Sequence, residues 1–364
     1  VGSIFDRSGV ALRLVNFAVS IVGRGPGMLP LVAISVAMFM GGISGSGPAT
    51  AAAVGGVMIA AMSRAGYPAA FSASVVAAAA STDILIPPSI AFIVYSVLVS
   101  GASVPALFAA GMFPGILAGL ALIVPAVWLS RRHKMGQNEA GEPRPPFWRS
   151  LREAAWGLMA PVVILGGMRM GWFTPTEAAV VAVFYGLFVG MVVHRTIGLR
   201  ALFEILREAG ELSAVILIVV SLAGIFAFSL STLGVIDPIT HAIVNSGLGE
   251  WGVMGAILVL LLIMGMFLDG ISIMLIFIPL AMPVVTHFQW DVVWFGSIVV
   301  LCIAIGQFAP PLAVNLMVAS KIANVRMEST TRWVLWMVLA MTLATLVVVA
   351  FPQIALWLPA KLGY

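Results

Sequence analysis

Long apolar runs separated by short polar stretches make up most of the chain. Five of them approach or exceed the roughly 20 apolar residues that a helix needs to cross a bilayer, at 105–130, 156–172, 176–194, 212–232 and 333–358. In two further regions, shorter apolar stretches are interrupted by Gly and Pro. The pattern predicts an all-α polytopic membrane protein.

Composition narrows the functional classes. Of the 364 residues, 62% are hydrophobic and 9% are charged, whereas a soluble domain carries about 25% charged residues. This excludes a soluble enzyme, a disordered chain and a nucleic-acid-binding domain. Cys302 is the only cysteine and the four histidines show no ligand spacing, so the sequence indicates neither a metalloenzyme nor a disulfide.

The basic residues gather in three clusters that orient the predicted helices. Short basic loops remain in the cytoplasm, so we place on that side the clusters within 131–152, 195–207 and 321–332. The polar stretch 131–153 is predicted to be a cytoplasmic linker that ends in a capping box of Ser150 and Glu153. Thr174 and Glu177 show the same capping pattern, which favours a structural role for Glu177 over that of a buried functional acid.

An internal repeat determines the predicted architecture. Residues 38–44 match residues 266–272 at five of seven positions, sharing Gly-Ile-Ser, and a double proline follows each about 40 residues later. Each unit thus combines a re-entrant helical hairpin with a broken helix, at 28–65 and 68–100 and again at 249–287 and 291–322. The positions of the basic clusters make the two repeats inverted. Paired, interrupted segments of this kind are typical of secondary transporters, whose half-helix ends bind substrate and ions.

The remaining regions are placed around these two units. We expect transport-domain repeat 1 at 28–130, where it includes the helix at 105–130, and transport-domain repeat 2 at 249–328. We expect a scaffold or arm helix at 1–27, scaffold helices at 154–248 and a C-terminal helix at 329–364.

Several motifs resemble the large membrane subunit of TRAP (tripartite ATP-independent periplasmic) transporters, the DctM-like proteins. The resemblance extends over essentially the whole chain and is carried by residues 42–46, 84–89, 173–179, 310–316 and 351–353. It implies an elevator-type secondary active transporter of the bacterial inner membrane, with Na⁺ as the coupling ion and organic acids (carboxylates) as substrates. It also implies two partners, a small membrane subunit and a periplasmic substrate-binding protein.

The resemblance also has limits. In family terms the first scaffold helices are expected to precede Val1. The chain departs from residues that are common in the family at Gly47, Thr50, Asp83, Gly270 and Ala309. Because these positions lie in the predicted site, the particular organic acid is left open.

The half-helix ends and the family motifs together give candidate site residues. For the substrate we expect Ser46, Thr50, Ser89 and Asn315, each beside a half-helix end. Hydroxyl and carbonyl oxygens at such ends suit Na⁺. We therefore expect Na⁺ at two sets of residues, one of Ser44, Gly45, Ser46 and Pro87 and the other of Asp269, Gly270, Ser272, Gln307 and Pro310.

Three charged residues fall within predicted membrane segments, where an acid is a functional-site hypothesis by default. Asp269 lies in a predicted hairpin tip and is expected to bind a cation or cap a helix. Asp83 has three candidate roles, which are to neutralise a cation, to be protonated or to cap the helix break. Arg169 is expected to snorkel to the membrane interface, which leaves helix dipoles and Na⁺ to recognise an anionic substrate.

Three other functions agree less well with the sequence. A stand-alone Na⁺/dicarboxylate-type symporter of the same architecture would need no binding protein, and the motif at 173–179 favours the binding-protein-dependent system. An intramembrane enzyme would need a histidine base near residues 42–46, and the pattern offers none. A channel is disfavoured because no ring of like charges accompanies the two hairpin tips.

Overall fold

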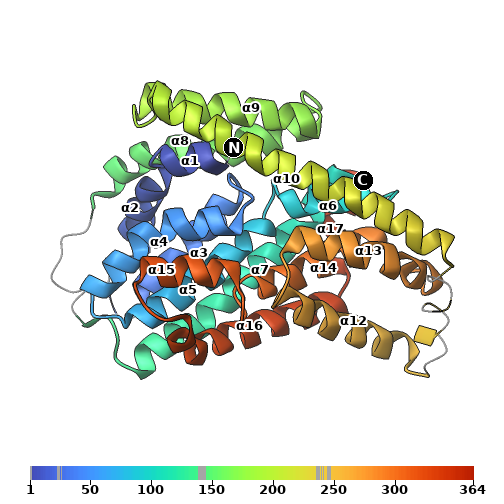
Figure 1. The fold of residues 1–364 in the computed structure, drawn as a ribbon. Coiled ribbons are helices and arrows are strands. Elements are labelled where there is room, and N and C mark those ends of the chain that lie inside the picture. The colour runs from blue at the N-terminus through green and yellow to red at the C-terminus, as the bar shows by residue number, and fades with distance from the viewer. Residues whose placement is uncertain are drawn as a thin grey trace.

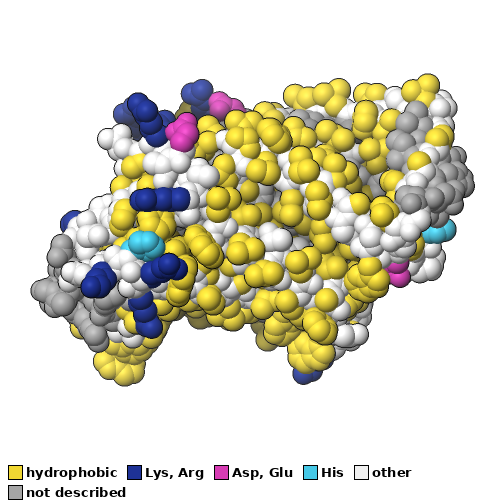
Figure 2. Space-filling model, turned by 90° about the horizontal axis from the view of Figure 1, so that it is seen from below, with side chains coloured by type: hydrophobic (Ala, Val, Ile, Leu, Met, Phe, Trp, Pro, Cys, Tyr) yellow, Lys and Arg dark blue, Asp and Glu magenta, His cyan; other side chains and the backbone are white. Residues whose placement is uncertain are grey.

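The protein is helical throughout the part of the chain that the structure describes. This computed structural model describes residues 2–22, 25, 27–137, 145–234, 238, 240, 242–243 and 247–364, which contain no strand. Six of the described helices are long and apolar enough to cross a membrane. Hydrophobic side chains cover most of the face in Figure 2, and Lys and Arg gather towards one end of it. The prediction of an all-α polytopic membrane protein is confirmed.

The first repeat unit is a helical hairpin followed by a broken helix. The hairpin consists of α3 (Met28–Gly41) and α4 (Gly47–Arg64), and residues 42–46 between them are named tip 1. The broken helix consists of α5 (Ala69–Ser81), the 3-10 helix η1 (Thr82–Ile84) and α6 (Ile90–Leu98). The long helix α7 (Val104–Arg132) follows.

The second unit repeats this order. Its hairpin consists of α12 (Gly249–Gly265) and α13 (Gly270–His287), joined by residues 266–269, named tip 2. Its broken helix consists of α14 (Val292–Gly306) and α15 (Val314–Ile322). The first parts of the two broken helices, α5 from Phe71 and α14 from Trp294, are buried to their last residues. Helices that are apolar on all sides are expected at such central positions.

The two units correspond in a register that differs from the one that the Gly-Ile-Ser motif suggests. A Cβ placed on Gly41 would lie 3.0 Å from the Cα of Asp83, and one placed on Gly265 would lie 3.0 Å from the Cα of Gly306. Gly41 therefore corresponds to Gly265, the last residue of the equivalent helix, and not to Asp269. As a result the first Gly-Ile-Ser lies in tip 1, whereas the second forms the first turn of α13.

The other helices lie beside the two units. One group consists of α1 (Gly2–Arg7), α2 (Val10–Val22), α8 (Phe147–Arg169), α9 (Pro175–Leu187) with its π-helical continuation η3 (Phe188–Val193), and α10 (Leu199–Thr232). Figure 1 shows α8, α9, α10 and α1 along one side of the molecule. The C-terminal part consists of η4 (Met327–Thr330), α16 (Thr331–Ala350) and α17 (Gln353–Leu362), and both α16 and α17 pack against α7.

Three predicted boundaries are wrong. Region 1–27 contains two helices instead of one, because the chain turns at Gly9, whose φ is 70°. The linker 131–153 is shorter than predicted, because α8 begins at Phe147 and Ser150 lies inside it without capping it. Region 329–364 is divided before Pro352, which cannot donate a backbone hydrogen bond to continue α16.

Parts of the predicted regions lie outside the described residues. These are residue 1 and residues 23, 24 and 26 of the arm region, residues 138–144 of the linker, and residues 235–237, 239, 241 and 244–246 of the scaffold region.

Candidate functional site

A buried acid from the broken helix holds tip 1. The Asp83 carboxylate accepts hydrogen bonds from the backbone N–H groups of Gly45 (3.0 Å) and Ser46 (2.9 Å) and from the Thr50 hydroxyl (2.7 Å). Ser46 stands at the N-cap position of α4, yet its side chain makes no capping bond. Asp83 instead accepts from the N–H of Ser46 itself, from 37 residues away. Of the three roles considered for Asp83, the structure shows capping, but of tip 1 instead of the helix break.

Gly45 allows tip 1 to lie directly against the start of α6. Its φ is 67°, in the left-handed region that favours glycine. A Cβ at this position would lie 2.6 Å from the carbonyl oxygen of Pro88. The turn and the close approach both require glycine, so tip 1 and the broken helix form one packed unit.

A cavity of about 440 Å³, named the tip 1 cavity, opens where two half-helices begin. Ser46 and Ala49 line it from the start of α4, and Ser89 lines it from the start of α6. Residues of α1, α8, α9 and α10 form the opposite wall. Helix N-termini present N–H groups and a positive dipole end, which favour an anion. The volume is typical of a small-molecule site, about 300–1,000 Å³.

The four residues predicted to bind substrate are divided between two places. Ser46 and Ser89 line the tip 1 cavity, together with Ser44 from the predicted Na⁺ set. The Ser89 hydroxyl also caps α6, since it donates to the Ile84 carbonyl (2.5 Å) and accepts from the Phe92 N–H (3.4 Å). Thr50 and Asn315 are buried and are not among the residues that line this cavity.

Asn315 and Gln307 bring the second unit against the first turn of α4. The Asn315 amide donates to the side-chain oxygen of Gln307 (3.2 Å) and to the Ala77 carbonyl (3.5 Å). Its own Oδ1 is buried and has no hydrogen-bond partner within the described part of the chain. A Cβ on Gly47 would collide with the Gln307 oxygen and lie 2.8 Å from the Asn315 Nδ2. The two repeat units therefore meet at Gly47.

Tip 2 has a smaller cavity, of about 160 Å³, named the tip 2 cavity. Asp269 and Gly270 line it at the start of α13, Val314 at the start of α15, Gln307 at the end of α14, and Pro48 from α4. The start of a hairpin helix and the start of a second half-helix thus meet at a cavity in both units. At the start of its hairpin helix the tip 2 cavity is lined by an acid, Asp269, whereas the tip 1 cavity is lined there by Ser46.

Asp269 caps α13. Its carboxylate accepts from the backbone N–H groups of Ile271 and Ser272 (3.1 Å each) and from the Ser272 hydroxyl (2.5 Å). Of the two roles considered for Asp269, the structure shows the cap, and its place on the cavity wall leaves a cation role as a proposal. Pro310, also in the predicted second Na⁺ set, is not among the residues lining this cavity.

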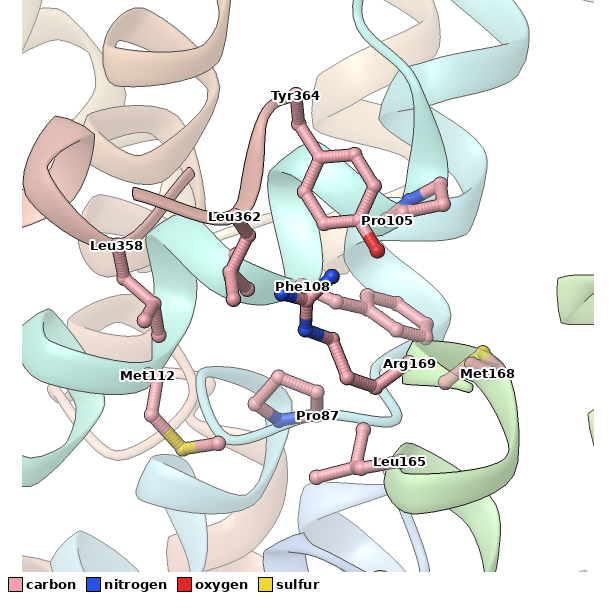
Figure 3. Close-up of a pocket in the computed structure, with 11 residues that line it drawn as sticks. Pro87, Pro105, Phe108, Met112, Leu165, Met168, Arg169, Leu358, Leu362 and Tyr364 are labelled. Carbon is pink, nitrogen blue, oxygen red and sulfur yellow. The ribbon is translucent and has the colours of Figure 1, made fainter. Parts of the chain in front are cut away.

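Arg169 and Pro87 lie at a third cavity, of about 210 Å³. Figure 3 shows the Arg169 guanidinium beside Phe108 and Leu362 and below the Tyr364 ring. The Arg169 residue is exposed. Pro87 thus lines the third cavity, whereas its neighbour Pro88 lines the tip 1 cavity.

Glu177 has the structural role that the sequence favours. The Thr174 hydroxyl accepts from the Glu177 N–H (3.3 Å), and the Glu177 carboxylate accepts from the Thr174 N–H (2.8 Å). Glu177 is exposed. The predicted capping box is confirmed.

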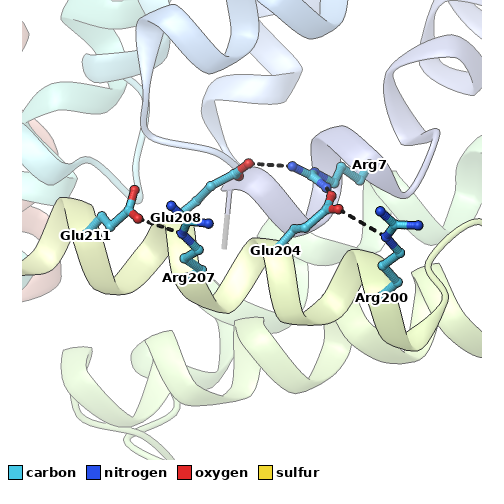
Figure 4. Close-up of polar contacts among 6 residues, drawn as sticks. All are labelled: Arg7, Arg200, Glu204, Arg207, Glu208 and Glu211. Carbon is cyan, nitrogen blue, oxygen red and sulfur yellow. Dashed lines mark hydrogen bonds and ion pairs between the residues drawn. The ribbon is translucent and has the colours of Figure 1, made fainter.

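An ionic network that the sequence did not predict lies beside the tip 1 cavity. Arg7 of α1 donates to Glu204 (2.8 Å) and to Glu208 (2.5 Å), both on α10 (Figure 4). Glu208 also lines the tip 1 cavity. Two acids four residues apart on one helix face were a signal that could have indicated a shared partner.

Comparisons with a family model and with known proteins all point to the same family of transport proteins. Residues 1–354 match the family model described as the tripartite ATP-independent periplasmic transporter, DctM component. The chain is 38% identical over 356 residues to the isethionate TRAP transporter permease protein DctMQ of Oleidesulfovibrio alaskensis, which covers 98% of this chain and 56% of that protein. The chain thus spans little more than half the length of that relative.

Two further relatives are matched over most of their length. The C4-dicarboxylate TRAP transporter large permease protein DctM of Pseudomonas aeruginosa is 37% identical, over 100% of this chain and 84% of its own. The protein of the same name from Rhodobacter capsulatus is 36% identical, over 100% of this chain and 85% of its own. These are transport proteins and not enzymes, and the chain belongs to the DctM family of tripartite ATP-independent periplasmic transporter components.

Proposed function

We propose that this protein is the large membrane subunit of a Na⁺-coupled, binding-protein-dependent importer of small organic anions in the bacterial inner membrane. The convergence of the N-terminal ends of α4 and α6 on the tip 1 cavity carries the proposal. Hydroxyls of Ser44, Ser46 and Ser89 add hydrogen-bonding groups on the same wall. Two relatives are named for organic anions, one for isethionate, which is a sulfonate, and one for C4-dicarboxylates.

The position of the tip 1 cavity supports an elevator mechanism. One wall belongs to the proposed transport domain, 28–130 and 249–328, through tip 1 and α6. The facing wall belongs to the proposed scaffold, 1–27 and 154–248, through α1, α8, α9 and α10. An anion held at the half-helix ends would therefore move with the transport domain past a fixed wall.

Na⁺ is proposed to bind at the two tips. At tip 2, Asp269 and Gln307 face one small cavity and offer carboxylate and amide oxygens. At tip 1, the backbone of Ser44, Gly45 and Ser46 lies against the start of α6. Na⁺ ions at these places would stabilise the tips in the arrangement that binds the anion. Na⁺ binding and anion binding would then be coupled.

The proposed partners are a small membrane subunit and a periplasmic substrate-binding protein. Their test is uptake of labelled succinate and isethionate by proteoliposomes that contain the complete membrane complex. We expect uptake only with an inward Na⁺ gradient and with the loaded binding protein present. Uptake without the binding protein would instead support the stand-alone symporter, and uptake that ignores Na⁺ would contradict the proposed coupling.

A further inference from the structure

We infer that Arg7 is the cation that binds the anionic group of the cargo, and that Glu208 takes the place of that group when the cavity is empty. The inference rests on the proposed function, because it requires an anionic cargo in the tip 1 cavity. It assigns a specificity-determining residue to the scaffold side of the cavity, opposite the half-helix ends.

The contacts place Arg7 at the edge of this cavity. Its Nη2 lies 2.5 Å from the Oε1 of Glu208, and Glu208 is one of the residues that line the cavity. Gly2 and Ser3 of the same short helix line the cavity too. Among the described residues that line it, no Lys or Arg occurs. Arg7 is therefore a cation that lies next to the cavity wall, where the ion pair with Glu208 holds it.

The charges explain why the pair is needed. A free carboxylate on the wall would repel an incoming carboxylate or sulfonate, and Glu208 is the acid on this wall. Bound to Arg7, the Glu208 charge is neutralised, and the guanidinium is kept close to the space that the cargo would occupy. The same guanidinium matches carboxylate and sulfonate oxygens because its N–H groups form a planar fork.

The geometry allows an exchange in which one hydrogen bond replaces another. Arg7 holds Glu204 through Nη1 (2.8 Å) and Glu208 through Nη2. Glu204 can keep the arginine in place while Nη2 passes from Glu208 to the cargo. The side chain of Glu208 is 51% exposed, so no neighbouring residue in the described part of the chain prevents it from turning away once released. Ion pairs between partly exposed groups are weak enough to be exchanged.

The test compares Arg7→Gln with Glu208→Gln in the purified membrane complex, with succinate and isethionate as ligands. Exchange predicts opposite effects on the dissociation constants. We expect Arg7→Gln to weaken binding about tenfold or more, the loss of one charge-assisted hydrogen bond. We expect Glu208→Gln to tighten binding severalfold, since the competing carboxylate is gone. A purely structural ion pair predicts that both variants change affinity in the same direction.

Further variants keep the inference falsifiable. Arg207→Gln and Glu211→Gln break an ion pair on α10 with 2.8 Å between its atoms and no contact with the cavity, so both should bind like the wild type. Arg7→Lys keeps the charge and should lose less affinity than Arg7→Gln. This variant still tests the inference if Arg7→Gln does not fold. Unchanged affinity in Arg7→Gln, while the wild type binds, would overturn this inference alone. Binding of neither anion to the wild type would overturn the proposed function and the inference with it.

Discussion

At the residue scale, Asp83 is the residue whose loss should be felt most strongly at tip 1. Asp83→Ala removes the acceptor for three buried or partly buried donors, on Gly45, Ser46 and Thr50. Each unsatisfied buried donor costs about 1–3 kcal/mol, so we expect a marked fall in Tm of the purified protein. Thr50→Val removes a single one of these bonds and should cost about 1 kcal/mol. Equal Tm values for the two variants would contradict the capping role.

Gly47 offers a second test at this scale, with a control on the same helix. Gly47→Ala forces a methyl group against Gln307 and Asn315, where the two repeat units meet, and should lower Tm. At Gly56, also in α4, no described atom outside the adjoining helix backbone and chain neighbours lies within 4 Å of an added Cβ. Gly56→Ala should be neutral or stabilising by up to about 1 kcal/mol, because alanine favours a helix. A Gly47→Ala protein as stable as Gly56→Ala would contradict the meeting of the units here.

The sequence identified the polar residues of the tips but not their partners. It placed Asp83, Asp269 and Ser89 within or beside the half-helix ends, and the structure shows Asp269 and Ser89 capping helix starts and Asp83 holding tip 1. A capping box such as that of Thr174 and Glu177 is readable because its partners are three residues apart. Asp83 caps a segment 37 residues away, and only the folded hairpin brings those atoms together.

At the element scale, the start of α13 separates a capping role from an ion-binding role. Asn is as good an N-cap as Asp, so Asp269→Asn should leave the Tm without Na⁺ nearly unchanged. If Asp269 contributes charge to a Na⁺ site, the same variant should reduce the rise in Tm that Na⁺ causes. Asp291→Asn changes the N-cap of α14 in the same way, outside the tip 2 cavity. An undiminished Na⁺ response in Asp269→Asn would exclude this acid from the ion site.

The start of α9 provides the opposite case, in which we expect an acid to have no transport role. Glu177→Gln keeps the capping box, since Gln also serves at this position. Because Glu177 is exposed and bonds to Thr174, the variant should transport at the wild-type rate. Loss of uptake with normal expression would show that the acid has a function beyond the cap.

The positions of helices followed from the apolar runs, but their exact ends and register did not. The predicted span 105–130 corresponds to α7 (Val104–Arg132), because its apolar run is long enough to cross a bilayer even though Pro114 and Pro125 lie inside it. The two Gly-Ile-Ser motifs suggest the wrong register between the two units. The first motif lies in tip 1 before α4, whereas the second forms the first turn of α13. Similar residues therefore do not mark equivalent positions here, and the packing of Gly41 and Gly265 defines the equivalence instead.

At the scale of the whole molecule, the tip 1 cavity is assembled from segments distant in the chain. Its walls come from α1, tip 1, α4, α6, α7, α8, α9 and α10. The repeat predicted that half-helix ends would meet, since paired interrupted segments mark binding sites in transporters. The Arg7 and Glu208 contact depends on how α1 packs against α10, and no short-range pattern in the sequence specifies that packing.

The most direct test of the account is whether filling the tip 1 cavity abolishes anion binding. Ala49 lines the cavity from the first turn of α4, whereas Ala52 is exposed on the same helix. The measurement is the rise in Tm of the purified complex on titration with succinate or isethionate in the presence of Na⁺, because a ligand that binds the folded state stabilises it. We expect Ala49→Leu to abolish the rise and Ala52→Leu to retain it, with similar Tm values without ligand. A full ligand-induced rise in Ala49→Leu would contradict the assignment of this cavity as the anion site.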